Sequence, residues 1–135
     1  MKREIVYKYL EELEGEIIQS FEDLDLHFEW EAGWRNDSCP IQITDQDYEG
    51  KPLNPIWGVI NMAGINNRII SELEHSDYDA IGRFVKDTVN NFRSPNYNFK
   101  VDIEAISVGT TVNIYNRPNV KGLWIRLDLN LKNYE

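Results

Sequence analysis

The clearest pattern of hydrophobic and polar positions lies at the end of the chain, over residues 122–135. Aliphatic residues occupy every second position, and polar residues with one tryptophan lie between them. Because successive side chains of a strand point to opposite faces, this alternation predicts a long strand with one buried face. The aliphatic series is Leu123, Ile125, Leu127, Leu129 and Leu131. The opposite series is Trp124, Arg126, Asp128, Asn130 and Lys132.

Two other segments have the spacing of three and four residues that is typical of amphipathic helices. In residues 2–20, the apolar positions are separated by glutamates. Residues 78–92 repeat this spacing, with Ser76 and Asp77 as the expected N-cap. Pro95 disfavours helical angles just before it, so the second helix should end near residue 92. Both helices are expected to pack on a sheet.

Shorter alternations predict the remaining strands. They cover residues 26–31, where His27 falls in mid-strand, and residues 40–45. A longer one covers residues 101–114, and its apolar phase flips by one residue, which predicts a bulge or bend near residues 105–109. A turn-rich connection over residues 116–122 should join this strand to the last one as a hairpin.

The segment of residues 56–73 is ambiguous, because its apolar residues fit either a strand or a long helix. Gly58 and Gly64 weigh against a helix interior and favour a strand over residues 56–65. A helical turn would then begin near Ile65 and run to Leu73. One long helix would instead remove a strand from the sheet.

The element order is therefore α-β-β-β-α-β-β, in a single domain of residues 1–135. We expect an α+β fold, with a mostly antiparallel sheet of about five strands and two helices packed on one face. A hydrophobic content of 41% and a charged content of 27% are ordinary for a globular domain.

The formal net charge of −9 argues against nucleic-acid binding through phosphates, which needs clustered cations. An acidic surface suits a basic partner, or a wall that repels DNA. Cys39 is the only cysteine, so no internal disulfide can form. No apolar run is long enough to span a membrane, and the N-terminal segment is unlike a signal peptide. Synthesis in the cytoplasm is the expectation.

No catalytic or cofactor-binding signature is found in the sequence. His27 and His75 are far apart, and no spacing typical of a transition-metal site occurs. Asp45, Asp47 and Glu49 alternate and could hold a hard cation, although a solvated acidic loop is the simpler explanation. An acid–base pair would need Glu29 or Glu31 to converge with Asp45. We expect no enzyme, no metal and no cofactor.

The face of the last strand opposite its aliphatic series is a candidate contact surface. A sheet backed by helices needs only one buried face, so this side is either exposed or a subunit contact. Trp124 favours a contact, because tryptophan is enriched at interface centres.

The end of the chain resembles the C-terminal hairpin of tail terminator proteins from long-tailed, lambda-like bacteriophages. The resemblance is carried by residues 103–108, by Gly122-Leu123-Trp124, and by the alternating run from Asp128 to Glu135. Four other segments resemble elements of this family in the same order. They are the first helix, residues 39–43, the loop around Tyr48 to Gly50 with the Trp57 strand, and residues 79–92. The resemblance covers nearly the whole chain in element order and length.

This resemblance implies a structural virion protein with no enzymatic activity. Such a protein forms a hexameric ring on the tail tube, stops tube polymerisation and joins the tail to the head connector. The implied partners are copies of itself, the tail tube protein and a head connector or completion protein, while DNA passes through without specific binding. It would be found in the host cytoplasm during assembly and then at the head-proximal end of the virion tail.

A ring closed by head-to-tail contacts needs two different, complementary patches on each subunit. The polar face of the last strand and the loop of residues 45–55 are the candidates. The candidate interface residues are Trp124, Arg126, Asp128, Asp45, Asp47, Tyr48, Glu49 and Lys51.

Three alternatives remain open from the sequence. An acidic immunity or inhibitor protein would bind a basic toxin or nuclease in a 1:1 complex. A small-molecule enzyme would need a concave pocket with converging carboxylates or His27. Another head–tail completion adaptor would share the fold and differ only in its position in the virion.

Overall fold

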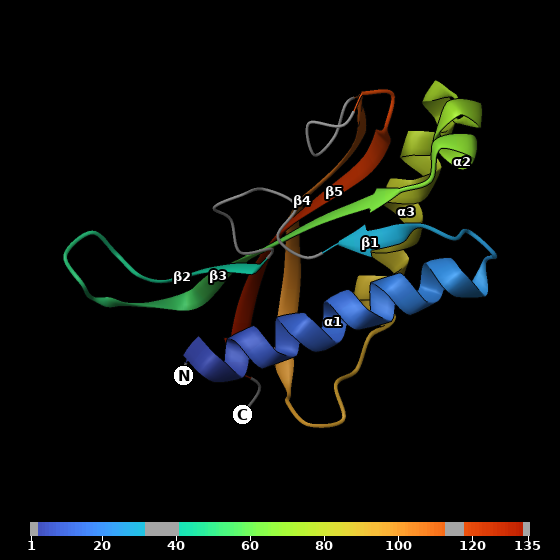
Figure 1. Cartoon of the computed structure of the whole chain (residues 1–135). Helices are drawn as coiled ribbons and strands as arrows, with labels where there is room; N and C mark the ends of the chain where they lie inside the picture. Colours follow the sequence, from blue (N-terminus) through green and yellow to red (C-terminus); the bar gives the residue numbers. More distant parts are fainter. Residues whose placement is uncertain (1–2, 32–40, 113–117, 134–135) are drawn as a thin grey trace.

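The computed structural model describes residues 3–31, 41–112 and 118–133 of the chain. Three helices and five strands make up these residues, in one layer of helices and one sheet (Figure 1). Their order is α1 (Arg3–Asp23), β1 (Glu29–Glu31), β2 (Ile41–Gln46), β3 (Pro52–Ile65), α2 (Asn67–Glu72), α3 (His75–Asn91), β4 (Phe99–Val112) and β5 (Lys121–Asn133). The predicted α+β class with an antiparallel five-stranded sheet is confirmed.

The sheet has the order β1-β3-β5-β4, and β2 pairs with β3 on the same side as β1. All pairings are antiparallel. The central pair is β3 with β5, in register from Ile56 opposite Leu131 to Ile65 opposite Gly122. The β2–β3 hairpin and β4 therefore lie at opposite edges of the sheet.

The core lies between one face of the sheet and the helices α1 and α3. The aliphatic series of β5 is almost completely enclosed there, and Leu123, Leu127 and Leu131 each have 0% exposure. At Gly58, an added Cβ would lie 3.0 Å from a methyl group of Leu10 on α1, so the missing side chain lets the helix approach β3. Each buried aliphatic side chain contributes roughly 1.5–3 kcal/mol.

The first predicted strand is shorter than its alternation suggested. β1 covers only residues 29–31, and the chain before it turns at Asp25, whose φ is 60°. Phe28 and Trp30 alternate because both rings pack around Phe21 of α1, with centroids 6.0 and 5.3 Å from it. The placement of His27 in mid-strand is therefore wrong, because it lies in the connection before β1.

The ambiguous segment is a strand followed by a short helix. β3 runs to Ile65, and Asn66 then caps α2 by accepting a hydrogen bond from the backbone N–H of Ile69 at 3.1 Å. The sequence of residues 45–55 is compatible with an exposed loop or an extended hairpin, and the structure has the extended hairpin, with β3 beginning at Pro52.

The start of α3 differs from the prediction by two residues. Glu74 is the N-cap, and its side chain and that of Asp77 bond each other's backbone N–H groups in a capping box. The backbone N–H of Glu74 donates to Asp77 Oδ2 at 2.7 Å. Asp77 therefore contributes to the cap from within the first turn, while the cap position itself precedes the predicted Ser76.

The predicted irregularity in β4 is a shift of register between Ile103 and Ala105. It lies at Glu104, one residue before the predicted window. The extra residue lets Val101 and Ile103 before it, and Ile106 after it, all face the helices despite the flip in apolar phase.

Candidate interaction surfaces

The second face of the sheet carries the polar series of β5. Arg126 lies opposite Asn61 and Ser107, and Asp128 lies opposite Val59 and Ala105. Among the residues that the structure describes, α1 and α3 pack only on the other face. The face predicted from the alternation of residues 122–135 therefore exists, and it is free of helices over this part of the chain.

Trp124 is half-buried, and its ring lies over Gly109 of β4, its neighbour in the ladder. A Cβ added at Gly109 would come within 2.5 Å of Trp124 Cζ2. Part of this tryptophan therefore already stabilises the β4–β5 pair, and only the rest is available for a partner.

Trp57 is the more exposed tryptophan of the second face, with 39% exposure. It stands opposite Asn130 on β5 and Thr44 on β2, close to the point where the hairpin leaves the sheet. Sequence reasoning did not select it as an interface residue. The sequence does contain an indication of its position, because Trp57 lies between Ile56 and Gly58, which both face the core.

The charges of Arg126 and Asp128 are paired with each other. Arg126 Nε donates to Asp128 Oδ2 at 3.2 Å, and Nη2 donates to Oδ1 at 3.1 Å. The hydrogen bond and charge of Asp128 raise the pKa of Arg126 further above its ordinary value. The two parallel hydrogen bonds fix the orientation of the Arg126 and Asp128 side chains relative to each other.

The second predicted patch is the tip of the β2–β3 hairpin. Asp47 Oδ1 accepts hydrogen bonds from the backbone N–H groups of Glu49 at 2.8 Å and Lys51 at 2.9 Å. Gly50 has the positive φ of 82° that the turn requires. Tyr48 projects from this ordered turn with 96% exposure. A rigid turn with an uncovered aromatic ring is a feature suited to docking.

The base of the hairpin is tied to α1. Arg3 Nη1 donates to the backbone carbonyl of Ile43 at 2.8 Å and to Asp45 Oδ1 at 3.2 Å. Asp45 is therefore an ion-pair partner and Asp47 a turn-forming residue. Among the described residues, no group of histidine, cysteine or acidic side chains is arranged to hold a metal ion.

The two predicted patches are not adjacent. β3 pairs with β5 only from Ile56 onward, so the earlier part of β3 and its hairpin overhang the sheet. Figure 1 shows the hairpin projecting to the left, away from the body that carries β5. Each subunit therefore has two separate candidate surfaces.

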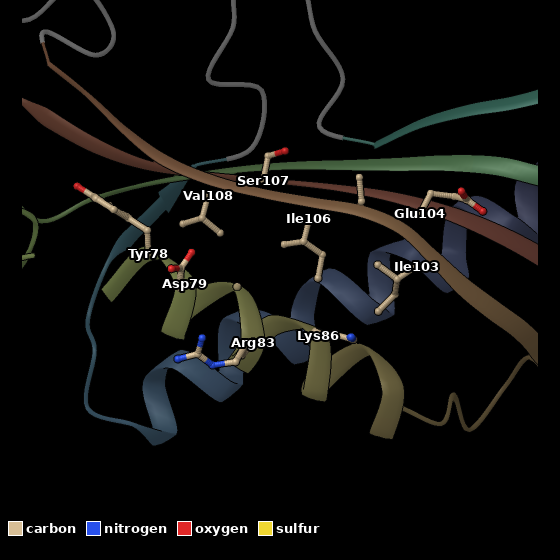
Figure 2. Close-up of a pocket in the computed structure, with 11 residues that line it drawn as sticks. Tyr78, Asp79, Arg83, Lys86, Ile103, Glu104, Ile106, Ser107 and Val108 are labelled. Atoms are coloured by element: carbon tan, nitrogen blue, oxygen red, sulfur yellow. The ribbon is translucent and has the colours of Figure 1, made fainter. Parts of the chain in front are cut away.

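The structure contains a groove that sequence reasoning missed. It lies between α3 and the edge strand β4, with a volume of about 590 Å³. Figure 2 shows Ile103, Ile106 and Val108 pointing from β4 toward α3, while Ser107 and Glu104 point away. The lining of α3 is Tyr78, Asp79, Gly82, Arg83 and Lys86.

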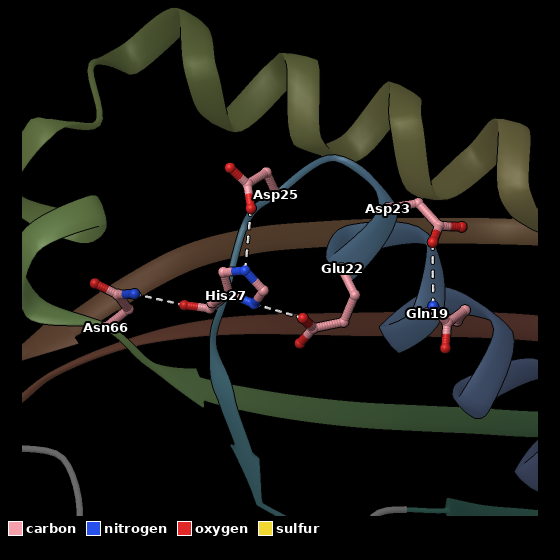
Figure 3. Close-up of polar contacts among 6 residues, drawn as sticks. All are labelled: Gln19, Glu22, Asp23, Asp25, His27 and Asn66. Atoms are coloured by element: carbon pink, nitrogen blue, oxygen red, sulfur yellow. Dashed lines mark hydrogen bonds and ion pairs between the residues drawn. The ribbon is translucent and has the colours of Figure 1, made fainter.

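A polar cluster at His27 joins three elements (Figure 3). Its ring nitrogens contact Glu22 at the end of α1 and, at 3.1 Å, Asp25, while its backbone carbonyl accepts from Asn66 Nδ2. Hydrogen bonding to Glu22 is the main cause of the raised pKa of His27, followed by the charge of Glu22. These contacts give His27 a structural role at the junction of α1, β1 and α2.

The carboxylates considered for acid–base chemistry do not converge. Glu29 lies opposite Ile65, whereas Thr44, next to Asp45, lies opposite Trp57. Those two positions are eight residues apart on β3 (65 − 57), or about 26 Å along the strand. The side chain of Glu31 lies outside the described residues.

Comparisons with protein-family models, curated proteins and solved structures found no match to this chain. Among the described residues, no helix has the length and apolar character required to cross a bilayer.

Proposed function

We propose that this chain is a structural subunit that assembles with copies of itself into a ring. The ring would be of the tail-terminator type, which closes the tail tube of a long-tailed bacteriophage and joins it to the head connector. The observation that carries this proposal is the unequal covering of the sheet. One face is packed against α1 and α3, and the other carries no helix among the described residues. On that second face Trp57 is 39% exposed, whereas Val59, Asn61 and Ala63 are buried.

The hairpin supports the same proposal. Its ordered tip exposes Tyr48 almost completely, and it overhangs the sheet at the edge opposite β4. Different surfaces at opposite edges are the arrangement that a head-to-tail ring needs, because each subunit must offer one patch and receive another. A two-fold dimer would instead use one patch twice.

The charge of the chain fits a ring through which DNA passes. With a net charge of −9, a lumen formed by several copies would repel phosphates and let DNA move without binding. The partners under this proposal are the tail tube protein and a head connector or completion protein. The protein would act in the host cytoplasm during assembly and then in the virion.

The test combines mass measurement with an assembly assay. Purified full-length chain is examined by mass photometry and negative-stain electron microscopy, and is then added to the polymerising tail tube protein encoded by the same phage or prophage. Rings with six copies and tubes that stop growing when the chain is added are expected. A strict monomer that leaves tube length unchanged removes the proposal.

An acidic binding protein is the second candidate, and the surface of α1 favours it. α1 carries Glu11, Glu12, Glu14 and Glu16 within two turns. Burial is the main cause of the raised pKa of Glu14, and repulsion from Glu11 adds to it. Such a helix suits a basic partner. A stable 1:1 complex with a basic protein encoded beside it, together with no self-association, would favour this candidate over the ring.

A further inference from the structure

We propose that the tip of the β2–β3 hairpin of one copy binds the groove between α3 and β4 of a second copy. This inference rests on the proposed self-assembly and names the two surfaces that meet in it. Here the hairpin tip means residues 47–51, and the α3–β4 groove means the cavity shown in Figure 2.

The placement of the two surfaces excludes a contact between them within one chain. The hairpin lies at the β2 side of β3, and β4 forms the opposite edge of the sheet. Figure 1 shows the hairpin on the left of the molecule and α3 to the right of the sheet. A tip therefore points away from its own groove, and it can reach only the groove of another copy.

The shape and polarity of the groove fit an aromatic side chain. Its floor is formed by half-buried Ile103, Ile106 and Val108, and its volume of about 590 Å³ lies within the usual range for ligand pockets, roughly 300–1,000 Å³. Gly82 contributes no side chain, and a Cβ placed there would be 3.8 Å from the nearest methyl group of Val108. The missing side chain leaves room beside α3 for the ring of Tyr48.

The charges of the two surfaces are complementary. Asp47 and Glu49 flank Tyr48 on the hairpin tip, and Glu49 is only loosely paired with Lys51, at 3.5 Å. Arg83 and Lys86 lie beside Asp79 on the α3 side of the groove, and neither cation has an ion-pair partner among the described residues. Glu104 of the β4 lining points away from α3 and accepts a hydrogen bond from Asn130. Two cations therefore outnumber the one carboxylate on the α3 side of the groove, which suits an acidic tip.

The tip is also ordered before it binds. The two bonds to Asp47 Oδ1, together with the bond from the Asp47 N–H to the Lys51 carbonyl at 2.9 Å, fix the turn. Little conformational entropy would therefore be lost on docking. Edge strand β4 has β5 on one side only among the described strands, so its other edge is open to the incoming hairpin.

The experiment uses two variants that each damage one surface. Tyr48→Ala removes the aromatic tip, and Arg83→Glu combined with Lys86→Glu reverses the charge of the groove. All three side chains are exposed, so both variants should unfold like the wild type. Each should self-associate at least about tenfold more weakly, as expected for the loss of an interface anchor. Tyr48→Phe should retain association, because it keeps the ring.

The decisive measurement mixes the two variants in equal amounts. The intact tip of the groove variant can bind the intact groove of the Tyr48→Ala variant, but the chain of contacts then ends. Discrete dimers and no rings are expected by mass photometry. Leu24→Ala and Arg68→Glu serve as matched controls, because both side chains are exposed and lie outside the two surfaces.

The outcomes separate this inference from the proposed function. Wild-type chain that never self-associates contradicts both. Two results contradict only the hairpin-to-groove contact. In the first, the wild type forms rings and Tyr48→Ala forms them with the same affinity. In the second, the mixture of the two variants yields no dimers.

Discussion

The two series of side chains on β5 lie on the same strand but differ in burial and in polarity. Leu123, Leu127 and Leu131 are fully enclosed between the sheet and the helices, whereas Arg126 and Asp128 lie on the helix-free face and form an ion pair with each other. The first series stabilises the fold, and in the second series the exposed Arg126 is the member most accessible to a contact outside the subunit. The alternation of a single strand therefore separates stability from association, so substitutions on the two faces should have separable effects.

The largest effect is expected from the enclosed series. Leu127→Ala should lower the free energy of unfolding by about 2–5 kcal/mol, because it leaves a cavity in a close-packed core. Denaturant unfolding in the weakly associating Tyr48→Ala background, at low protein concentration, measures this loss. A loss below about 1 kcal/mol would show that the helices do not enclose this face.

The next effect tests the contact between the two strands on the helix-free face. Gly109→Val should cost about 1–3 kcal/mol, because the new Cβ would lie 2.5 Å from the ring of Trp124. Combining Gly109→Val with Trp124→Leu should recover part of the loss, since a smaller side chain leaves space for the branched one. Strict additivity of the two substitutions in a double-mutant cycle would argue against the contact.

A smaller effect on stability is expected from the polar series. Arg126→Ala should change the free energy of unfolding by at most about 1 kcal/mol, because the Arg126 side chain is 45% exposed and solvent screens its ion pair. It should nevertheless weaken self-association severalfold, because the helix-free face is proposed as a subunit contact in addition to the contact between the hairpin tip and the α3–β4 groove. Sedimentation velocity compares it with Arg68→Glu, which should associate normally. If stability falls sharply while association is unchanged, the assignment of roles to the two faces is reversed.

The smallest effect concerns pH and the junction at His27. Because its pKa is raised in the folded chain by Glu22 and Asp25, the fold binds the proton more tightly than the unfolded chain does. This contribution to stability is complete below about pH 6.5 and disappears as the pH rises through the raised folded pKa. The melting temperature of the wild type should therefore fall slightly over that interval, and the fall should be reduced in His27→Gln. An identical pH profile in both proteins would remove His27 as its source.

The sequence predicted the elements whose pattern extends over many residues. The alternation in residues 122–131 is long enough to fix both the strand β5 and its two faces. The alternation in residues 26–31 is short, and it arises because Phe28 and Trp30 pack around Phe21, without a full strand. A local pattern of that length cannot distinguish packing from strand pairing.

The interaction surfaces were only partly predictable, for a related reason. The hairpin is predictable because residues 45–55 form one continuous polar segment with Gly50, Pro52 and Pro55, which is long enough to reach a neighbouring protein. The groove combines α3 with β4, and its space depends on the missing side chain of Gly82 and on three aliphatic residues that face it. Such a hollow is created by the packing of two elements, and neither element reveals it alone.

Self-association of the intact chain is the most direct test of the proposed ring. Sedimentation velocity of the wild type over a wide range of concentrations, with electron microscopy of the same samples, should reveal a closed assembly with the mass of six chains. A single species with the mass of one chain at every concentration would contradict the assignment of the helix-free face and the hairpin to subunit contacts.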